Sequence, residues 1–207
     1  MKKTLFILFL TGSGLFAYAF MNVKPTPEIS KTLAFPVSGR SKIGSFWGDK
    51  RDGGKRTHEG IDIFARKGTP VVALCDGIIV CSANTPRGGK NLWLQSFKYP
   101  WRAYYAHLDQ KKVSEGQVVK KGQVIGTVGN TGNAKYTPAH LHFGIYKILG
   151  GAENPLPWVK YSKKTTVTAK TAVVKKTPPA TKTTVTKKAP VTKQISLAAK
   201  PSVIRRK

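Results

Sequence analysis

The sequence predicts an all-β domain over residues 33–160, built as a compact antiparallel two-sheet sandwich or β-roll. Short runs rich in β-branched and aromatic residues are separated there by Gly, Pro, Asn and Asp, which is typical of strands joined by turns. No window of twelve residues keeps a clean 3.6-residue apolar period, so long amphipathic helices are not expected. After Tyr161 the composition changes to Lys, Thr, Val, Ala and Pro without aromatic residues, which predicts a disordered tail over 161–207.

Residues 1–19 predict an export signal. Two lysines precede an apolar run at 5–10, and Ala17-Tyr18-Ala19 provides an A-x-A cleavage site. The apolar stretch 4–21 is also long enough to stay uncleaved as a membrane anchor, and contact with a membrane is expected only in that case. Both alternatives place the rest of the chain outside the cytoplasm, in the periplasm or the extracellular cell envelope. Residues 20–32 are then a linker to the domain.

Two segments, 68–80 and 116–126, share a pattern of Gly, Val, Gly and an apolar pair. Asp76-Gly77 is a two-residue hairpin signal, so we expect two similar hairpins that face each other across the domain. In that hairpin register Cys75 and Cys81 are offset by three residues, which is about 10 Å along a strand. Because the Cα atoms of a disulfide lie within about 7 Å, both thiols are predicted to be free.

The chain has four histidines, and their spacing is typical of a site built on strands. His140 and His142 alternate with apolar residues, so a strand would place both rings on the same face. His58 and Asp62 are four residues apart, which suits one face of either a helix or an extended chain. A glycine and two isoleucines within this segment favour the start of a strand, and Glu59 would then point away from the pair.

The residue types in these motifs suit a metal site. His58, Asp62 and one member of the 140/142 pair would supply two imidazoles and one carboxylate. Catalytic zinc takes three such protein ligands and leaves a fourth position for water, so the set predicts one zinc ion per chain. His107 and the remaining histidine of the pair would then lie outside the ligand set.

Three motifs carry a more specific signal. They are His58-x-x-x-Asp62, Tyr105-Ala106-His107-Leu108 and His140-Leu141-His142-Phe143. Together they resemble the lysostaphin/LytM-type zinc endopeptidases, which cut peptide cross-bridges of bacterial peptidoglycan through a metal-activated water. The resemblance covers about residues 33–158 and implies a two-sheet all-β domain with a groove, and peptidoglycan as the partner. It also implies a zinc ion held by His58, Asp62 and His142, with His107 and His140 as the catalytic residues.

Two alternatives stay open at this point. Some members of the resembled family lose ligands and act as cell-wall binding modules or as activators of another hydrolase. Here all three ligand positions and both catalytic histidines are filled, which favours an active enzyme. The second alternative is a zinc hydrolase that acts on ordinary proteins. The motifs do not specify which cross-link bond is cut.

Charge is concentrated at the C-terminal end. The net charge is +27, and residues 161–207 contain 13 Lys and Arg and no acidic residue. This tail is expected to be either a solvated extension or an electrostatic contact with anionic polymers of the cell envelope, an attraction that salt would screen. Predicted export argues against nucleic acid as a partner. We expect a monomer.

Overall fold

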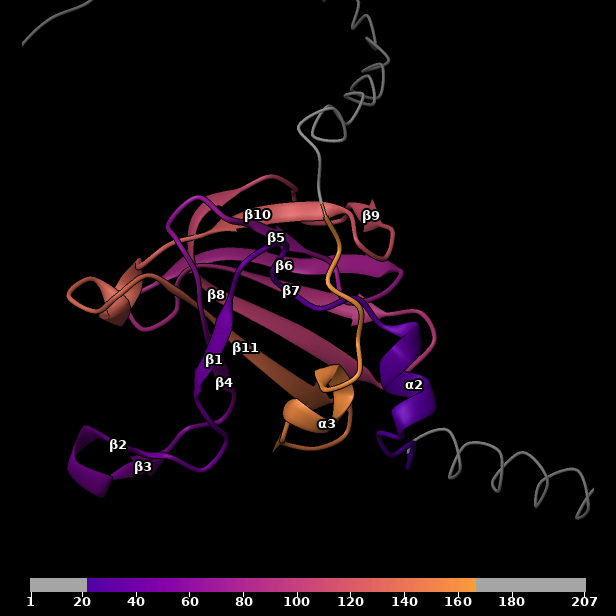
Figure 1. Cartoon of the computed structure of the whole chain (residues 1–207), viewed down its shortest axis with the longest axis horizontal. Coiled ribbons are helices and arrows are strands. Elements are labelled where there is room, and N and C mark those ends of the chain that lie inside the picture. Colours follow the sequence, from indigo (N-terminus) through magenta and orange to yellow (C-terminus); the bar gives the residue numbers. More distant parts are fainter. Residues whose placement is uncertain (1–21, 167–207) are drawn as a thin grey trace, which may run out of the picture. The chain divides into compact units, whose positions relative to one another are not determined.

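The computed structural model describes residues 22–166 (Figure 1), and this part of the chain is dominated by antiparallel strands, as expected. Its strands are β1 (Lys42–Ser45), β2 (Lys50–Arg51), β3 (Arg56–Thr57), β4 (Ile61–Phe64), β5 (Pro70–Val72), β6 (Gly77–Thr85), β7 (Gly89–Ser96), β8 (Trp101–Lys111), β9 (Val118–Val119), β10 (Val124–Val128), β11 (His140–Lys147) and β12 (Ala152–Glu153). Its helical turns are α2 (Pro27–Thr32), α3 (Leu156–Val159) and the 3-10 turns η1 (Asp52–Gly54) and η2 (Gly132–Ala134).

Ten strands form one hydrogen-bonded sheet in the described residues, in the order β1-β4-β11-β8-β7-β6-β9. The long strand β8 pairs with β11 through its first half and with β10 through its second half, and β10 also pairs with β5. The two expected layers are therefore parts of one sheet that share β8. Strands β2 and β3 form a separate hairpin, which Figure 1 shows set apart from the large sheet.

Alternation along the strands separates a core face from a polar face. In β11, Leu141, Phe143 and Ile145 are fully buried in a single hydrophobic core, whereas His140 and His142 point to the opposite face, as a period of two requires. The same core takes side chains from β4, β5, β6, β7, β8 and β10. Burial of this apolar face fixes the register of each strand, because a shift by one residue would expose it.

The prediction of a hairpin at Asp76-Gly77 is wrong. The strands on either side of it do not pair with each other; instead β5 pairs with β10, and β6 pairs with β9 and β7. A Cβ added at Gly77 would clash with the carbonyl oxygen of Gln95 on β7, so this glycine permits close approach of two strands and does not form a tight turn. The two similar segments are thus paired crosswise, each strand of one with a strand of the other.

Both cysteines are free, as predicted. Cys75 is buried, and burial raises the pKa of its thiol to about 11, while Cys81 is half-buried. The outcome agrees with the prediction although the hairpin register that led to it does not occur.

The segment 20–32 was expected to be a linker, but its described part contains the short helix α2. Thr26 caps α2, and its hydroxyl accepts a hydrogen bond from the backbone N–H of Ile29. Ser30 is fully buried and accepts a hydrogen bond from the backbone of Tyr161 beside α3. A local sequence pattern of six residues is too short to reveal such a helix, since short helices depend on tertiary packing.

Residues 161–166, expected to begin the tail, run along the N-terminal segment. The backbone N–H of Phe35 donates to the carbonyl of Lys163, and the hydroxyl of Ser38 donates to the carbonyl of Thr165. The ammonium group of Lys164 lies over the ring of Phe35. The expected signal sequence and the rest of the tail lie outside the described residues. Within the described part, no helix has the length and apolar character needed to cross a membrane.

A chain that ends at Tyr161 should be less stable than a chain that ends at Thr166. The shorter chain loses the hydrogen bonds of Phe35 and Ser38 to residues 163 and 165, each worth about 0.5–1.5 kcal/mol net. For a protein of this size about 1 kcal/mol corresponds to about 2–4 °C in Tm, so we expect a decrease of about 4–8 °C by calorimetry. Equal Tm values would show that the segment contributes nothing to the fold.

Candidate functional site

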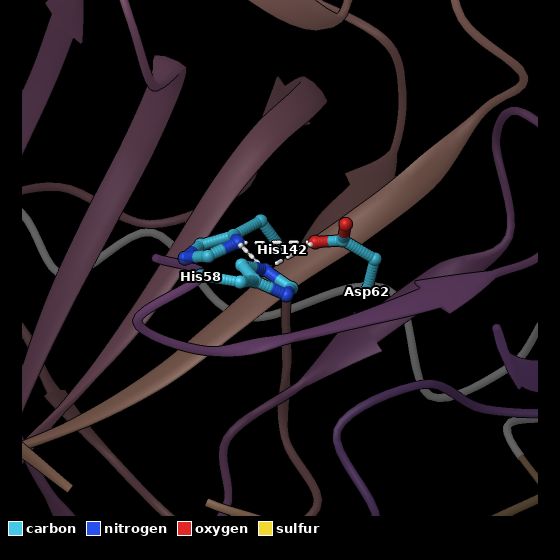
Figure 2. A group of neighbouring side chains, drawn as sticks. All are labelled: His58, Asp62 and His142. Carbon is cyan, nitrogen blue, oxygen red and sulfur yellow. Dashed lines mark hydrogen bonds and ion pairs between the residues drawn. The ribbon is translucent and has the colours of Figure 1, made fainter. Parts of the chain in front are cut away.

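The pairing of β4 with β11 brings together three of the residues expected at the site. Asp62 on β4 lies directly opposite His142 on β11, so both side chains project from the same face of the sheet. His58 lies in the loop just before β4, and its backbone is held by Asp49, whose carbonyl accepts the N–H of His58. Figure 2 shows the three side chains pointing toward one another.

Three atoms of this cluster form a small triangle. His58 Nε2 lies 2.9 Å from His142 Nδ1, His142 Nδ1 lies 3.0 Å from Asp62 Oδ1, and His58 Nε2 lies 3.1 Å from the same oxygen. Tetrahedral ligands about 2.0–2.1 Å from a zinc ion are about 3.3 Å apart. Two imidazoles and one carboxylate at this spacing fit zinc.

Neighbouring groups set the orientation and charge of the triangle. His58 Nδ1 donates to the carbonyl of Phe46 at 2.8 Å, which leaves the lone pair of Nε2 directed at the cluster, as in many metal-binding histidines. Arg51 Nη2 donates to Asp62 Oδ2 at 2.7 Å and to the hydroxyl of Ser45 at 2.7 Å. The outer oxygen of the carboxylate is thus bound, and its inner oxygen faces the two rings.

The ionisation states of the cluster suit metal binding. Burial alone would raise the pKa of Asp62, but its close contacts with the rings of His142 and His58 outweigh burial and hold that pKa well below its ordinary value. Burial lowers the pKa of His142 despite its contact with the carboxylate. An ionised carboxylate and neutral imidazoles are the forms that bind metals.

His107 reaches the same face through an irregularity of β8. In the pairing of β7 with β8, Leu92 lies opposite Tyr105 and Lys90 opposite Leu108, so one extra residue is present on β8. His107 adopts φ 60°, a left-handed conformation that is uncommon for residues other than glycine. Tyr105 and Leu108 are both buried in the core, whereas Ala106 and His107 both line the opposite face. This β-bulge redirects the histidine, as bulges near active sites often do.

His107 and His140 form a second pair beside the triangle. Their ring centroids are 5.0 Å apart, and His107 lies 6.0 Å from the ring of His142. His107 Nδ1 donates to the carbonyl of Thr131 at 2.9 Å, and His140 Nδ1 donates to the carbonyl of Pro138 at 2.8 Å, so Nε2 is the free nitrogen of each neutral ring. Burial lowers the pKa of His107 to about 4.

All five predicted residues line one open groove with a volume of about 730 Å³. Three aromatic side chains are part of its lining, with ring centroids 4.5 Å apart for Trp93 and Tyr104 and 4.9 Å apart for Trp93 and Tyr146. Glu59 is exposed and lines the groove, and the cluster of His58, Asp62 and His142 does not include it. Such a groove can hold an extended chain next to the triangle.

The sequence reasoning missed the residues that orient these side chains. Arg51 lies in a charged, glycine-rich stretch that gave no motif signal. Phe46 and Thr131 act through backbone carbonyls, which residue type does not reveal. The glycine and threonine content of the segment 129–132 was the one available signal for a tight loop.

Replacing His107 with glycine should give a more stable protein than replacing it with alanine. An L-residue in the left-handed conformation costs about 1–2 kcal/mol, more than the about 0.5–1 kcal/mol by which glycine usually destabilises a strand. We expect the metal-free His107→Gly variant to have a Tm about 2–4 °C above that of His107→Ala. Ala103→Gly, at a regular position of β8, is the control and should lower the Tm. A His107→Ala variant as stable as His107→Gly would contradict the positive φ.

Known proteins share this fold and these motifs. A model of Peptidase family M23 matches residues 56–155. The L-Ala--D-Glu endopeptidase of Bacillus subtilis (strain 168) is 39% identical over 145 residues, which cover 62% of this chain and 44% of that protein. Murein hydrolase activator NlpD of Escherichia coli (strain K12) is 37% identical over 128 residues, with 62% and 31% covered. The chain thus spans less than half the length of these two relatives.

Solved structures extend the likeness to the whole domain. The catalytic domain of lysostaphin from Staphylococcus simulans has 30% sequence identity and a TM-score of 0.53, with 66% of this chain and 99% of that chain covered. A zinc-containing peptidase from Vibrio cholerae has 29% identity and a TM-score of 0.52, with 58% and 37% covered. The shared strands, the matched family model and the lysostaphin domain covered almost completely show that this chain belongs to peptidase family M23.

Proposed function

We propose that this chain is a zinc-dependent endopeptidase that hydrolyses peptide cross-bridges of bacterial peptidoglycan. The observation that carries the proposal is the triangle of His58, Asp62 and His142 in a groove that also holds two further histidines. Relatives named L-Ala--D-Glu endopeptidase and Glycyl-glycine endopeptidase ALE-1 support a peptide-bond substrate of this class. Export to the periplasm or cell envelope, where peptidoglycan lies, is part of the same proposal.

His58, Asp62 and His142 would hold the zinc ion through Nε2, Oδ1 and Nδ1, the three atoms that converge. When bound, zinc lowers the pKa of water toward about 7 and polarises the scissile carbonyl group. Arg51 and the carbonyl of Phe46 keep the carboxylate and the ring of His58 aimed at the ion.

His107 and His140 would carry the proton transfers. Each ring donates its Nδ1 proton to a backbone carbonyl, so Nε2 can accept a proton from the attacking water. A ring that has taken up this proton can hydrogen-bond the developing oxyanion and deliver the proton to the leaving amine. The aromatic side chains of Trp93, Tyr104 and Tyr146, which line the groove, would contact the peptide beside these groups.

An activator without hydrolytic activity is the second candidate. The 37% identity to Murein hydrolase activator NlpD favours it. The presence of all three ligand positions and both histidines in one groove favours the enzyme. Under either function the basic tail could add attraction to anionic envelope polymers, since it contains 13 Lys and Arg residues and no acidic residue in 161–207.

Substitutions at the two kinds of histidine should have different effects. His142→Ala and Asp62→Ala should lose both zinc and activity, because each removes a ligand. His107→Ala and His140→Ala should keep near-stoichiometric zinc and lose turnover by about 10²–10⁴-fold, the usual worth of a general acid or base. The measurements are metal analysis of each purified variant and release of soluble fragments from purified peptidoglycan.

The wild-type chain is the reference for this comparison. Stoichiometric zinc without release of fragments from any peptidoglycan, together with stimulation of a second hydrolase, would establish the activator instead. Digestion of casein without an effect on cell walls would show that the substrates are ordinary proteins and not peptidoglycan. Zinc loss in His140→Ala with zinc retained in His142→Ala would reverse the ligand assignment.

Arg51→Met should weaken zinc binding without abolishing it. The substitution keeps an extended side chain but removes the hydrogen bond to Asp62 Oδ2, and the loss of such an orienting partner typically costs about 10–100-fold in metal affinity. Competition with a chromogenic chelator measures the dissociation constant. Arg56→Met is the matched control, because Arg56 pairs with Asp52 in the same hairpin and contacts no proposed ligand. Equal weakening in both variants would point to a general effect of charge.

A further inference from the structure

Thr131, in a neighbouring loop, contacts the bulge at His107. Thr131 precedes the 3-10 turn η2 and lies between β10 and β11 in the chain. Its carbonyl accepts the Nδ1 proton of His107 at 2.9 Å. Because a carbonyl oxygen can only accept, this contact requires the proton on Nδ1 and leaves Nε2 unprotonated in the neutral ring.

The hydroxyl of Thr131 bridges the two strands where the bulge ends. It accepts a hydrogen bond from the backbone N–H of Lys90 at 2.9 Å and donates one to the carbonyl of Leu108 at 2.9 Å. Lys90 and Leu108 lie opposite each other in β7 and β8. The side chain therefore joins both strands at the position where the extra residue of β8 disturbs their pairing.

Glycines allow the loop to approach this closely. Cβ atoms added at Gly89 and at Gly132 would clash with Thr131 and with Gly89, respectively. Both glycines have positive φ values, 57° and 70°. The backbone N–H of His107 donates to the carbonyl of Gly88 at 2.8 Å, so the histidine is also held from the turn between β6 and β7.

We propose that Thr131 is a positioning residue that fixes the tautomer and direction of His107. Its hydroxyl anchors the loop to β7 and β8, and its carbonyl then holds the Nδ1 proton so that Nε2 of His107 is presented to the groove as a hydrogen-bond acceptor. Thr131 makes no contact with His58, Asp62 or His142 among the described hydrogen bonds. The proposal rests on the proposed role of His107 in hydrolysis and adds the residue that orients its ring for that role.

The tautomer can be read directly by ¹⁵N NMR of histidine-labelled, zinc-loaded full-length protein. His107 is assigned by the signals missing from the spectrum of His107→Gln. We expect the wild-type ring to be the Nδ1–H form. Thr131→Val, which keeps the shape of the side chain and removes the hydroxyl, should give a mixture of both tautomers, and Thr131→Ser should restore the wild-type pattern.

Kinetics add a second readout. Thr131→Val should lower kcat about 10–100-fold with KM and zinc content unchanged, since loss of an orienting partner costs about this much, and Thr131→Ser should recover most of it. Thr127→Val is the matched control, because the hydroxyl of Thr127 accepts a backbone N–H of a neighbouring strand, from Gln110 of β8, and makes no described hydrogen bond with His107. It should leave tautomer and kcat unchanged.

The outcomes separate this inference from the proposed function. An Nε2–H ring in the wild type, or an unchanged tautomer in Thr131→Val, would overturn the role of Thr131. The wild-type spectrum alone makes the first of these tests if Thr131→Val does not fold. A wild-type protein with the Nδ1–H tautomer that releases nothing from peptidoglycan would overturn the proposed hydrolysis while the positioning of His107 stands.

Discussion

The site depends above all on the register between β4 and β11. Asp62 and His142 face each other across this pair, and a slip of one residue would send one of them into the core. That register is fixed by the apolar side chains of the opposite face, Leu141 and Phe143 on β11 with Ile61 and Ile63 on β4, all fully buried. The hydrophobic core on one face of the sheet thus determines where the polar atoms on the other face meet.

A second constraint comes from the outer shell of hydrogen bonds. The cluster itself joins a carboxylate to two imidazoles, which would otherwise adopt several rotamers and tautomers. Arg51 holds one carboxylate oxygen, and the carbonyl of Phe46 holds one ring nitrogen. Both come from the segment around the hairpin β2–β3, which is set apart from the large sheet (Figure 1). The geometry of the proposed metal site therefore depends on a small element that contributes little to the core.

Sequence patterns were sufficient for features that depend on local alternation. A period of two and the residue types predict the strand that contains His140 and His142 and the all-β class. They also predict the strand that starts just after His58. Sequence patterns were insufficient where a residue breaks the two-residue period of a strand. His107 would face the core in a regular strand next to Tyr105 and Ala106, and only the bulge brings it to the groove. Long-range pairing was equally hidden, since Asp76-Gly77 suits a hairpin locally while β5 finds its partner in β10.

The crosswise pairing of the two similar segments has a consequence for the order of folding. Val71 pairs with Gly126 and Ile78 with Val118, so neither segment can close on itself, and the entropy of closing long loops must be overcome before these contacts form. β4 likewise has no partner on its inner side until β11 is available. A chain synthesised from its N-terminus accordingly holds the residues of the groove apart until its C-terminal strands have been made. Under the proposed function, this topology keeps an unfinished chain inactive, because such a chain has no assembled site.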